Sequence, residues 1–322
     1  MNARTPAIPV IPIPKVSVCV ITYNQESYIS QCLQSLVDQQ TDFEFEVIVG
    51  DDFSTDRTRE IVLEFQRVYP HIVKTRFQPF NTGGSRNNLE VHASARGYYV
   101  AHLDGDDYAL PGKLQAQADA LDADDMCNAV WHPVDFFDDA GGFCSGTTAD
   151  LSIFPGGQVS FGDAIRFGYV GVYSALMYRR SSLTPIDPSR QLLDLYFTWD
   201  TLSKGHGRVL LQVLGRYRVM STGSLQVKSR SGVRRLTIAH AHEFLARFPK
   251  HRRNFMIWAL SCALFEFKNG RNGFLDYVRF AWQARSLIAL HQIVDNVRKV
   301  RRARVKWQTL RQSKTMPVTG NI

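Results

Sequence analysis

Three carboxylates stand within four consecutive residues, Asp104, Asp106 and Asp107, with Gly105 between the first two. They follow an apolar run over residues 98–103, which predicts that they lie at the end of a buried strand. Hard oxygen ligands of this kind suit Mg²⁺ or Mn²⁺, and such an ion keeps open positions for diphosphate oxygens. The segment therefore predicts a divalent-cation site, and a solvated acidic turn in front of the next helix is the alternative.

Two further polar loops directly follow short β-branched runs. The first loop holds Thr22, Tyr23 and Asn24, and the second holds Asp51 and Asp52. In open α/β sheets, ligands bind outside the carboxyl ends of the strands. The three loops are therefore expected to converge on one ligand site, although a turn that caps the following helix is the alternative for the second loop.

The segments that position these loops alternate between strand and helix patterns. Short apolar runs predict buried strands over residues 16–21, 45–50 and 98–103. Apolar residues at helical spacing predict helices over residues 28–37 and 61–68. Repeated alternation of this kind predicts an α/β fold with a doubly wound, mostly parallel, Rossmann-like sheet.

The three loops, in this order, resemble the motifs of the family 2 glycosyltransferases, whose nucleotide-binding domain has the fold called GT-A. Members of that family open with a strand that leads into a T-Y-N-type loop and continue with a D-D-x-S-x-D loop. They then reach an A-x-G-x-Y-V-A-x-L-D-x-D-D stretch, which here covers residues 95–107. The resemblance implies a GT-A domain that binds a nucleotide-diphospho-sugar donor.

The resemblance also implies roles for the residues of the first two loops. Thr22, Tyr23 and Asn24 would line the nucleotide pocket, with Tyr23 stacked on the base. Asp52 would form a hydrogen bond with the base, and Asp51 belongs to the same nucleotide-binding loop.

In the third loop, Asp104 and Asp106 match the D-x-D pair near the ribose, the diphosphate and the metal. Asp107 matches the following carboxylate, which can also ligate the cation. Arg86 lies in a segment similar to the family's glycine-plus-Arg-Asn segment, where a guanidinium meets phosphate or sugar hydroxyls. A surface loop without a ligand is the alternative for Arg86.

Inverting sugar transfer needs a base that takes the proton of the acceptor hydroxyl. Relatives place this carboxylate beyond the nucleotide-binding part, at the start of a helix, and Asp194 falls at the matching position. Asp200, six residues further along the same helix, and Asp187, in a proline-flanked loop, are the alternatives. The chain departs from the family pattern at Leu193, where many relatives have Glu or Gly, and at Met220, where many have His.

The net charge of +8 hides two regions of opposite character. Residues 228–322 contain 20 Lys and Arg against 4 Asp and Glu, whereas residues 1–227 contain 18 against 26. The basic region holds apolar segments at helical spacing, over residues 255–267 and 274–282, and a cationic cluster at residues 298–307. This mixture predicts binding to an anionic membrane surface. The alternatives are a solvated basic face on a packed helix or a disordered end. Nucleic acid is not expected as a partner, because no recognition motif is present.

The expected organisation is a Pro-rich extended leader at residues 1–14, a GT-A domain at 15–227 and a basic amphipathic helical region at 228–322. Within the GT-A domain, residues 15–125 would bind the nucleotide sugar and residues 126–227 would complete the acceptor site. The longest apolar stretch is too short to span a bilayer. Five scattered cysteines favour a reducing compartment, so we expect a cytoplasmic protein, peripheral on the inner face of the membrane.

The sequence thus predicts an inverting, metal-dependent glycosyltransferase with a UDP-linked donor and a saccharide or lipid-linked saccharide acceptor, in cell-surface polysaccharide synthesis. One alternative is a nucleotidyltransferase, although residues 22–26 do not supply a glycine-rich, basic phosphate loop. The other is a non-catalytic binding or scaffold subunit of the same fold, against which the complete carboxylate motifs argue.

Overall fold

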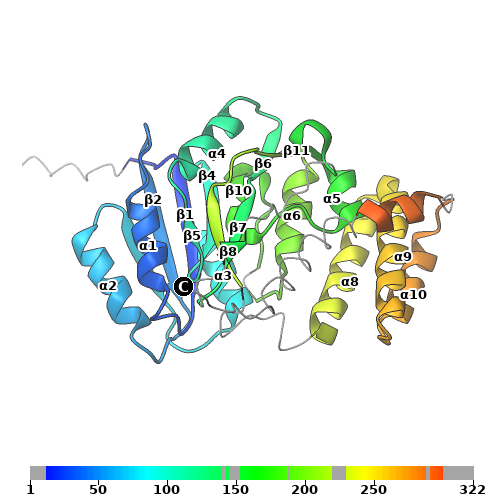
Figure 1. The fold of residues 1–322 in the computed structure, drawn as a ribbon, viewed down its shortest axis with the longest axis horizontal. Helices are drawn as coiled ribbons and strands as arrows, with labels where there is room; N and C mark the ends of the chain where they lie inside the picture. Colours follow the sequence, from blue (N-terminus) through cyan, green and yellow to red (C-terminus); the bar gives the residue numbers. More distant parts are fainter. Residues whose placement is uncertain are drawn as a thin grey trace, which may run out of the picture.

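A computed structural model describes residues 12–139, 143–144, 153–187, 189–219, 230–287 and 291–299. Most of the expected leader, Met220 and most of the cationic cluster at 298–307 lie outside these residues. The centre of the molecule is an eight-stranded sheet in the order β3-β2-β1-β4-β10-β6-β11-β9 (Figure 1). Its strands are β1 (Val16–Thr22), β2 (Phe45–Asp51), β3 (Val73–Phe77), β4 (Tyr99–Asp104), β6 (Cys127–Trp131), β9 (Gln158–Ser160), β10 (Met177–Arg179) and β11 (His206–Val209).

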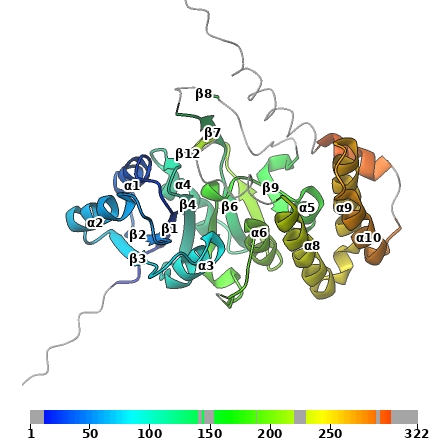
Figure 2. The same cartoon turned by 90° about the horizontal axis from the view of Figure 1, so that it is seen from below.

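Helices cover both faces of this sheet, which confirms the doubly wound fold. The helices of the two layers are α1 (Ile29–Val37), α2 (Thr58–Val68), α3 (Gly84–Ser94), α4 (Lys113–Asp122), α5 (Phe161–Phe167) and α6 (Asp194–Leu202). Successive strand residues point to opposite faces, so the strands buried on both faces are mostly apolar, with Ser17, Glu46 and His102 as buried polar exceptions. In β1, Val18 and Val20 pack in the core with α1 and α4, whereas Cys19 packs in the core with α3 and α6 (Figure 2).

The three predicted strands and both predicted helices of the first half are confirmed. The prediction omitted β3, an edge strand that reads VKTRF and shows little apolar pattern. It also omitted α3, because its first turns are polar. Arg86 therefore lies in the first turn of a helix and not in a loop.

Two strands run against the direction of the other six. β10 lies between β4 and β6 and is antiparallel to both, and β9 is antiparallel to β11 at the edge of the sheet. Because β10 pairs with β4, the nucleotide-sugar part and the acceptor part expected on either side of residue 125 share one sheet.

A smaller four-stranded sheet lies beside the ends of β4 and β6. It has the order β5-β12-β7-β8 and consists of β5 (Tyr108–Ala109), β7 (Val134–Phe137), β8 (Phe143–Cys144) and β12 (Gly215–Arg218). β12 is antiparallel to β5 and parallel to β7. This sheet brings Arg218, the last residue of β12, next to the acidic loop that follows β4.

The basic C-terminal region is helical, as predicted for residues 255–267 and 274–282. Its helices are α8 (Arg230–Arg247), α9 (Arg252–Lys268) and α10 (Phe274–Ala284), at the opposite end of the molecule from α1 and α2 (Figure 1). Trp199 of α6 contacts the rings of Phe244, Phe255 and Trp258 edge-on, so the core of the sheet continues into these helices. Among the described residues, no helix is long and apolar enough to cross a membrane.

Candidate functional site

The acidic loop begins at the last residue of β4 and turns sharply at Gly105. The backbone amide of Gly105 donates to the carbonyl oxygen of Ile21, 2.9 Å away. A Cβ atom at position 105 would lie 2.5 Å from Oε1 of Gln25 and 3.0 Å from Cβ of Thr22. The chain needs glycine here because the acidic loop and the first loop approach each other so closely.

Asp107 is the buried member of the acidic loop. Its Oδ1 accepts a hydrogen bond from the backbone amide of Arg218 at 2.8 Å, and the guanidinium of Arg218 donates to the carbonyl oxygen of Asp106 at 2.9 Å. The Oδ2 atom of Asp107 is buried without a hydrogen-bond partner among the described residues. Burial, followed by the charges of Asp106 and Asp104, raises the pKa of Asp107 well above its ordinary range.

These features fit a divalent cation. Within the described residues, no group of three or more His, Cys, Asp or Glu side chains is arranged so that it could hold a metal ion. The unsatisfied Oδ2 of Asp107 and the raised pKa nevertheless show that the loop holds more negative charge than its surroundings compensate. A cation that takes its remaining ligands from a diphosphate and from water matches an incomplete set of this kind.

Asp104 lies at the part-exposed end of β4 and is held on both sides. Its Oδ1 lies 3.1 Å from Nε2 of His102, and its Oδ2 accepts from Oγ of Ser174 at 3.3 Å. Ser174 belongs to a short 3-10 turn, η2 (Tyr173–Ala175), just before β10. Burial acts to raise the pKa of Asp104, but the His102 and Ser174 hydrogen bonds and the charge of Lys113 lower it more, so that the net shift is downward. Asp104 is therefore ionised.

Lys113, the first residue of α4, is completely buried behind the acidic loop. Its Nζ donates to the carbonyl oxygen of Ser174 at 2.6 Å. Burial lowers the pKa of Lys113 to about 8, although the charges of Asp107 and Asp104 oppose the shift. The ammonium group supplies positive charge beneath the carboxylates.

The first predicted loop lies against the acidic loop and presents one aromatic ring to solvent. Thr22 is buried, and its Oγ1 donates to Oε1 of Gln25 at 2.8 Å. Tyr23 is 45% exposed, so its ring is accessible for stacking on a base. Asn24 adopts a positive φ of 53°, and its Oδ1 accepts from the backbone amide of Thr55 at 2.8 Å, which ties the first and second loops together.

The two carboxylates of the second loop are both buried but differ in their partners. Asp52 accepts from the backbone amides of Thr82 and Gly83, at 2.7 and 2.9 Å, just before α3 begins. Asp51 is completely buried and accepts from Ser54 and from the guanidinium of Arg59. Asp52 thus fixes the segment in front of α3, and Asp51 fixes the turn of its own loop.

Arg86 points along its own helix. Its Nε donates to Oε1 of Glu90 at 2.9 Å, and the side chain is half exposed. Arg76 of β3 pairs with the same glutamate at 3.3 Å. In the described part of the chain, no hydrogen bond or ion pair joins Arg86 to the acidic loop, so its predicted role in donor binding requires a change of partner.

Asp194 is the first residue of α6, as the sequence predicted for a base that opens a helix. Its carboxylate is exposed, and Oδ1 accepts from the backbone amide of Leu195 at 2.8 Å. The surrounding protein removes part of its water shell, and the negative charge of Asp104 adds to this effect, so the pKa of Asp194 is raised. The candidate base thus has an electrostatic interaction with Asp104 of the acidic loop.

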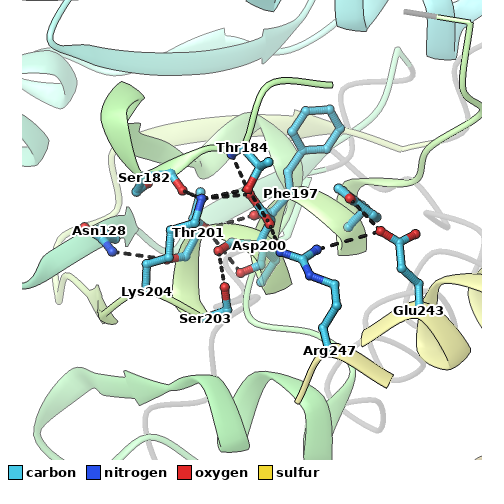
Figure 3. A network of polar contacts seen from close by, with 12 residues as sticks. Asn128, Ser182, Thr184, Phe197, Asp200, Thr201, Ser203, Lys204, Glu243 and Arg247 are labelled. Carbon is cyan, nitrogen blue, oxygen red and sulfur yellow. Dashed lines mark hydrogen bonds and ion pairs between the residues drawn. The ribbon is translucent and has the colours of Figure 1, made fainter. Parts of the chain in front are cut away.

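The two alternative bases have other partners. Asp200 is completely buried, and its carboxylate accepts from the backbone amide of Thr184 at 2.6 Å, from Arg247 of α8 at 3.0 Å and from Lys204 at 3.3 Å (Figure 3). Asp187 is exposed and caps its own turn through the backbone amide of Ser189. Of these three carboxylates, Asp194 is therefore the one that is both exposed and in electrostatic interaction with Asp104, and it stays the predicted base.

Sequence reasoning missed four residues that hold the acidic loop, namely His102, Lys113, Ser174 and Arg218. His102 gave a signal, since it is a polar residue inside an otherwise apolar strand run. Arg218 also gave a signal, since it lies in a segment, residues 217–220, that is similar to the family's Y-R-(V/I)-H segment. Lys113 and Ser174 gave none, because their contacts join segments that are 60 or more residues apart in the chain.

Comparisons with known proteins bear on the family and the fold of the chain. The family model described as glycosyl transferase family 2 matches residues 17–181. An uncharacterized protein of Mycobacterium tuberculosis is 40% identical over 119 residues, which are 37% of this chain. The aligned part spans only 34% of that relative, about a third of its length.

Two solved structures share the fold. S. aureus TarS 1–349 in complex with UDP-GlcNAc has a TM-score of 0.61 and 19% identity, over 91% of this chain and 92% of that one. The mannosyltransferase PcManGT from Pyrobaculum calidifontis, in complex with GDP-Man and Mn²⁺, has a TM-score of 0.58 and 18% identity, over 92% of this chain and 84% of that one. At these identities the likeness shows the fold, which confirms the expected GT-A architecture.

Proposed function

Because the chain belongs to glycosyl transferase family 2, we propose that it transfers a sugar from a nucleoside-diphosphate sugar to an acceptor hydroxyl, with inversion at the anomeric carbon. UDP is the nucleotide we propose for the donor, which agrees with the UDP-GlcNAc bound to the TarS structure. The acceptor class is a saccharide or a lipid-linked saccharide of a cell-surface polysaccharide.

The observation that supports this proposal is the position of Asp194 at the start of α6, where it interacts electrostatically with Asp104. One carboxylate belongs to the loop that the family uses for the donor, and the other belongs to the part that completes the acceptor site. Two carboxylates with opposite pKa shifts suit two different tasks in one reaction.

In the proposed reaction, Asp194 takes the proton of the acceptor hydroxyl as its oxygen attacks the anomeric carbon. The bond to the diphosphate breaks on the opposite face of the sugar, so the configuration inverts. The raised pKa of Asp194 strengthens it as a base, and the exposed position lets an acceptor reach it.

On the donor side, the exposed ring of Tyr23 would stack on the base, and Asn24 and Thr22 would line the same pocket. Asp52 is already fixed by Thr82 and Gly83, which leaves it oriented for one further hydrogen bond from the base. When the sugar donor binds, Arg86 would leave Glu90 and bind an oxygen atom of the donor. Asp51 would act by holding the second loop in place.

The residues that would hold a divalent cation, Mn²⁺ or Mg²⁺, are Asp104, Asp106 and Asp107. When bound, the ion offsets negative charge on the departing diphosphate. The fit rests on the unsatisfied oxygen of Asp107 and on its raised pKa.

Nucleotide titration with and without metal tests the donor site. UDP, GDP and dTDP are titrated into the purified chain by calorimetry, first with Mn²⁺ and then with a chelator. We expect one nucleotide to bind in Mn²⁺, and binding to weaken by roughly 100-fold with the chelator or with Asp106→Ala, because each change removes cation-mediated contact with the diphosphate.

The control is Asp119→Ala, which removes an exposed carboxylate of α4 that, within the described residues, accepts a hydrogen bond from Gln115 alone. It should bind nucleotide like the wild type. Absence of nucleotide binding under all conditions would overturn the proposed transfer and favour the scaffold alternative. Equal binding with and without the chelator would remove the cation from the proposal.

We further propose that the C-terminal helices hold the enzyme on an anionic membrane surface, where a lipid-linked acceptor would be presented. On α10, Leu275, Val278 and Trp282 are 48%, 42% and 76% exposed, and their spacing places them on one outward stripe. Arg279 and Arg285 are exposed beside this stripe. Apolar and cationic groups on one face, with a tryptophan, suit the interface of an anionic bilayer.

Vesicle binding tests this face. Trp282→Gln should weaken binding to phosphatidylglycerol-containing vesicles by roughly tenfold, because a partly buried indole contributes about 1.5 kcal/mol. Binding is measured by co-sedimentation, with Leu211→Gln as the control because Leu211 is equally exposed, at 78%, but lies in the turn after β11. Wild-type binding that is equal for neutral and anionic vesicles, or unchanged in Trp282→Gln, would contradict the membrane proposal.

A further inference from the structure

Hydrogen bonds connect three buried side chains in series, and the last of the three contacts Asp104. The Tyr178 hydroxyl lies 2.9 Å from Nδ1 of His92, and Nε2 of His92 lies 3.0 Å from Nδ1 of His102. Nε2 of His102 then lies 3.1 Å from Oδ1 of Asp104. The three side chains come from β10, α3 and β4 respectively and are 1%, 6% and 1% exposed.

The three hydrogen bonds can run in one direction in which every donor has an acceptor. Asp104 accepts, so His102 donates from Nε2 and its Nδ1 is left as an acceptor for Nε2–H of His92. Nδ1 of His92 in turn accepts the hydroxyl proton of Tyr178. The opposite direction would leave that buried proton without an acceptor, because His92 is the partner of the Tyr178 hydroxyl within the described residues.

We propose that Tyr178 and His92 are positioning residues for Asp104, which act by fixing the ring of His102 so that its Nε2–H points at Oδ1 of Asp104. The inference deepens the proposed function and rests on it, because the role of Asp104 towards the donor and its cation comes from there. The relay, meaning Tyr178, His92 and His102, thus fixes the position of one carboxylate oxygen of Asp104.

The surroundings of the relay keep it rigid and dry. The ring of Tyr173 lies over His102, with 3.9 Å between the ring centroids, and the hydroxyl of Tyr173 accepts from Asn88 at 3.4 Å. The next residue, Ser174, binds the other oxygen of Asp104. Both oxygens of Asp104 are therefore held, one by the relay and one by η2, while the carboxylate itself stays 42% exposed to a ligand.

The first test reads the tautomers directly in the wild-type protein without ligand. Nitrogen-15 chemical shifts of the imidazole rings distinguish protonated from unprotonated nitrogens. We expect Nε2–H and bare Nδ1 for both His92 and His102. Protonation of His102 at Nδ1 would overturn the inference, whatever the enzyme does with a donor.

The second test measures what the relay does for the donor. Tyr178→Phe removes only the oxygen that starts the relay, and we expect about fivefold weaker binding of the nucleotide in Mn²⁺, a typical effect of losing one buried hydrogen bond. The control is Tyr99→Phe, at the other end of β4, which loses a 2.5 Å hydrogen bond to Asp122 but none to the relay. Equal binding in the two variants would contradict the inference.

A matched pair at position 102 separates hydrogen bonding from packing. The side-chain amide of His102→Gln can still donate to Asp104, whereas His102→Leu fills similar space without a donor. We expect the Gln variant to keep most nucleotide affinity and the Leu variant to lose roughly tenfold. Both are first checked for unchanged thermal unfolding, and equal affinity in the two would overturn the relay.

The two tests also separate the inference from the proposed function. If the wild type binds no nucleotide, the proposed function fails, and the tautomer measurement still decides whether the relay exists. If the wild type binds nucleotide but its histidines carry other tautomers, the relay fails and the proposed function stands.

Discussion

Asp194→Asn is expected to lower kcat by about 10³-fold, because the amide cannot take the proton of the acceptor hydroxyl. The KM for the donor should change by less than about twofold, since Asp194 lies on the acceptor side and not in the nucleotide loops. In the wild type, kcat should fall as pH decreases through the raised pKa of Asp194, because the base must be ionised. Steady-state kinetics over a range of pH measure both effects.

A matched control for this variant is Asp163→Asn. Asp163 is also a carboxylate in the first turn of a helix, α5, where it forms a capping box with Ser160. We expect Asp163→Asn to lower the stability somewhat and to leave kcat unchanged. That result would show that a carboxylate in the first turn of a helix is not by itself what the reaction needs. Turnover retained in Asp194→Asn would remove Asp194 from the role of base.

Asp200→Ala is expected to lower the free energy of unfolding by about 2–4 kcal/mol, which corresponds to a Tm about 3–6 °C lower. The reason is that Arg247, Lys204 and the amide of Thr184 lose a buried acceptor that joins α6 to α8. Thermal unfolding followed by circular dichroism measures the loss. At a temperature where the variant is folded, kcat should remain close to that of the wild type.

Lys204→Met serves as a companion to this variant. It removes one partner of Asp200 that is itself 38% exposed, so the expected loss of stability is smaller. A fully stable Asp200→Ala that has lost turnover would reverse the assignment and make Asp200 the base.

The contrast between Asp194 and Asp200 shows where prediction from the sequence stops. Both residues are aspartates on the same helix, and composition does not separate them. At about 100° a residue, six residues place Asp200 about 240° around the helix from Asp194, so the two cannot share a face. Which face of α6 lies towards the acidic loop depends on how α6 packs on the sheet. This packing is tertiary structure, which the sequence pattern of one helix does not predict.

β1, β2 and β4 and the polar loops after them were predictable because these strands are buried and read as mostly apolar runs. The acidic loop was predictable for the same reason, since its position after β4 follows from the run before it. β10 was not, because three residues that read MYR show no periodicity. With β10 the prediction also missed Ser174 and Tyr178, and therefore most of what holds Asp104.

The insertion of β10 between β4 and β6 has a consequence for how the chain acquires its activity during synthesis. Until residue 179 has been made, β4 has an unpaired edge on the side that β10 will occupy, and Lys113 lacks the carbonyl oxygen of Ser174. The segment that holds the three polar loops therefore depends on β10, although it comes first in the chain. We expect a fragment that ends before residue 173 to expose this edge of β4 and to lack the contacts of Ser174 with Lys113 and Asp104.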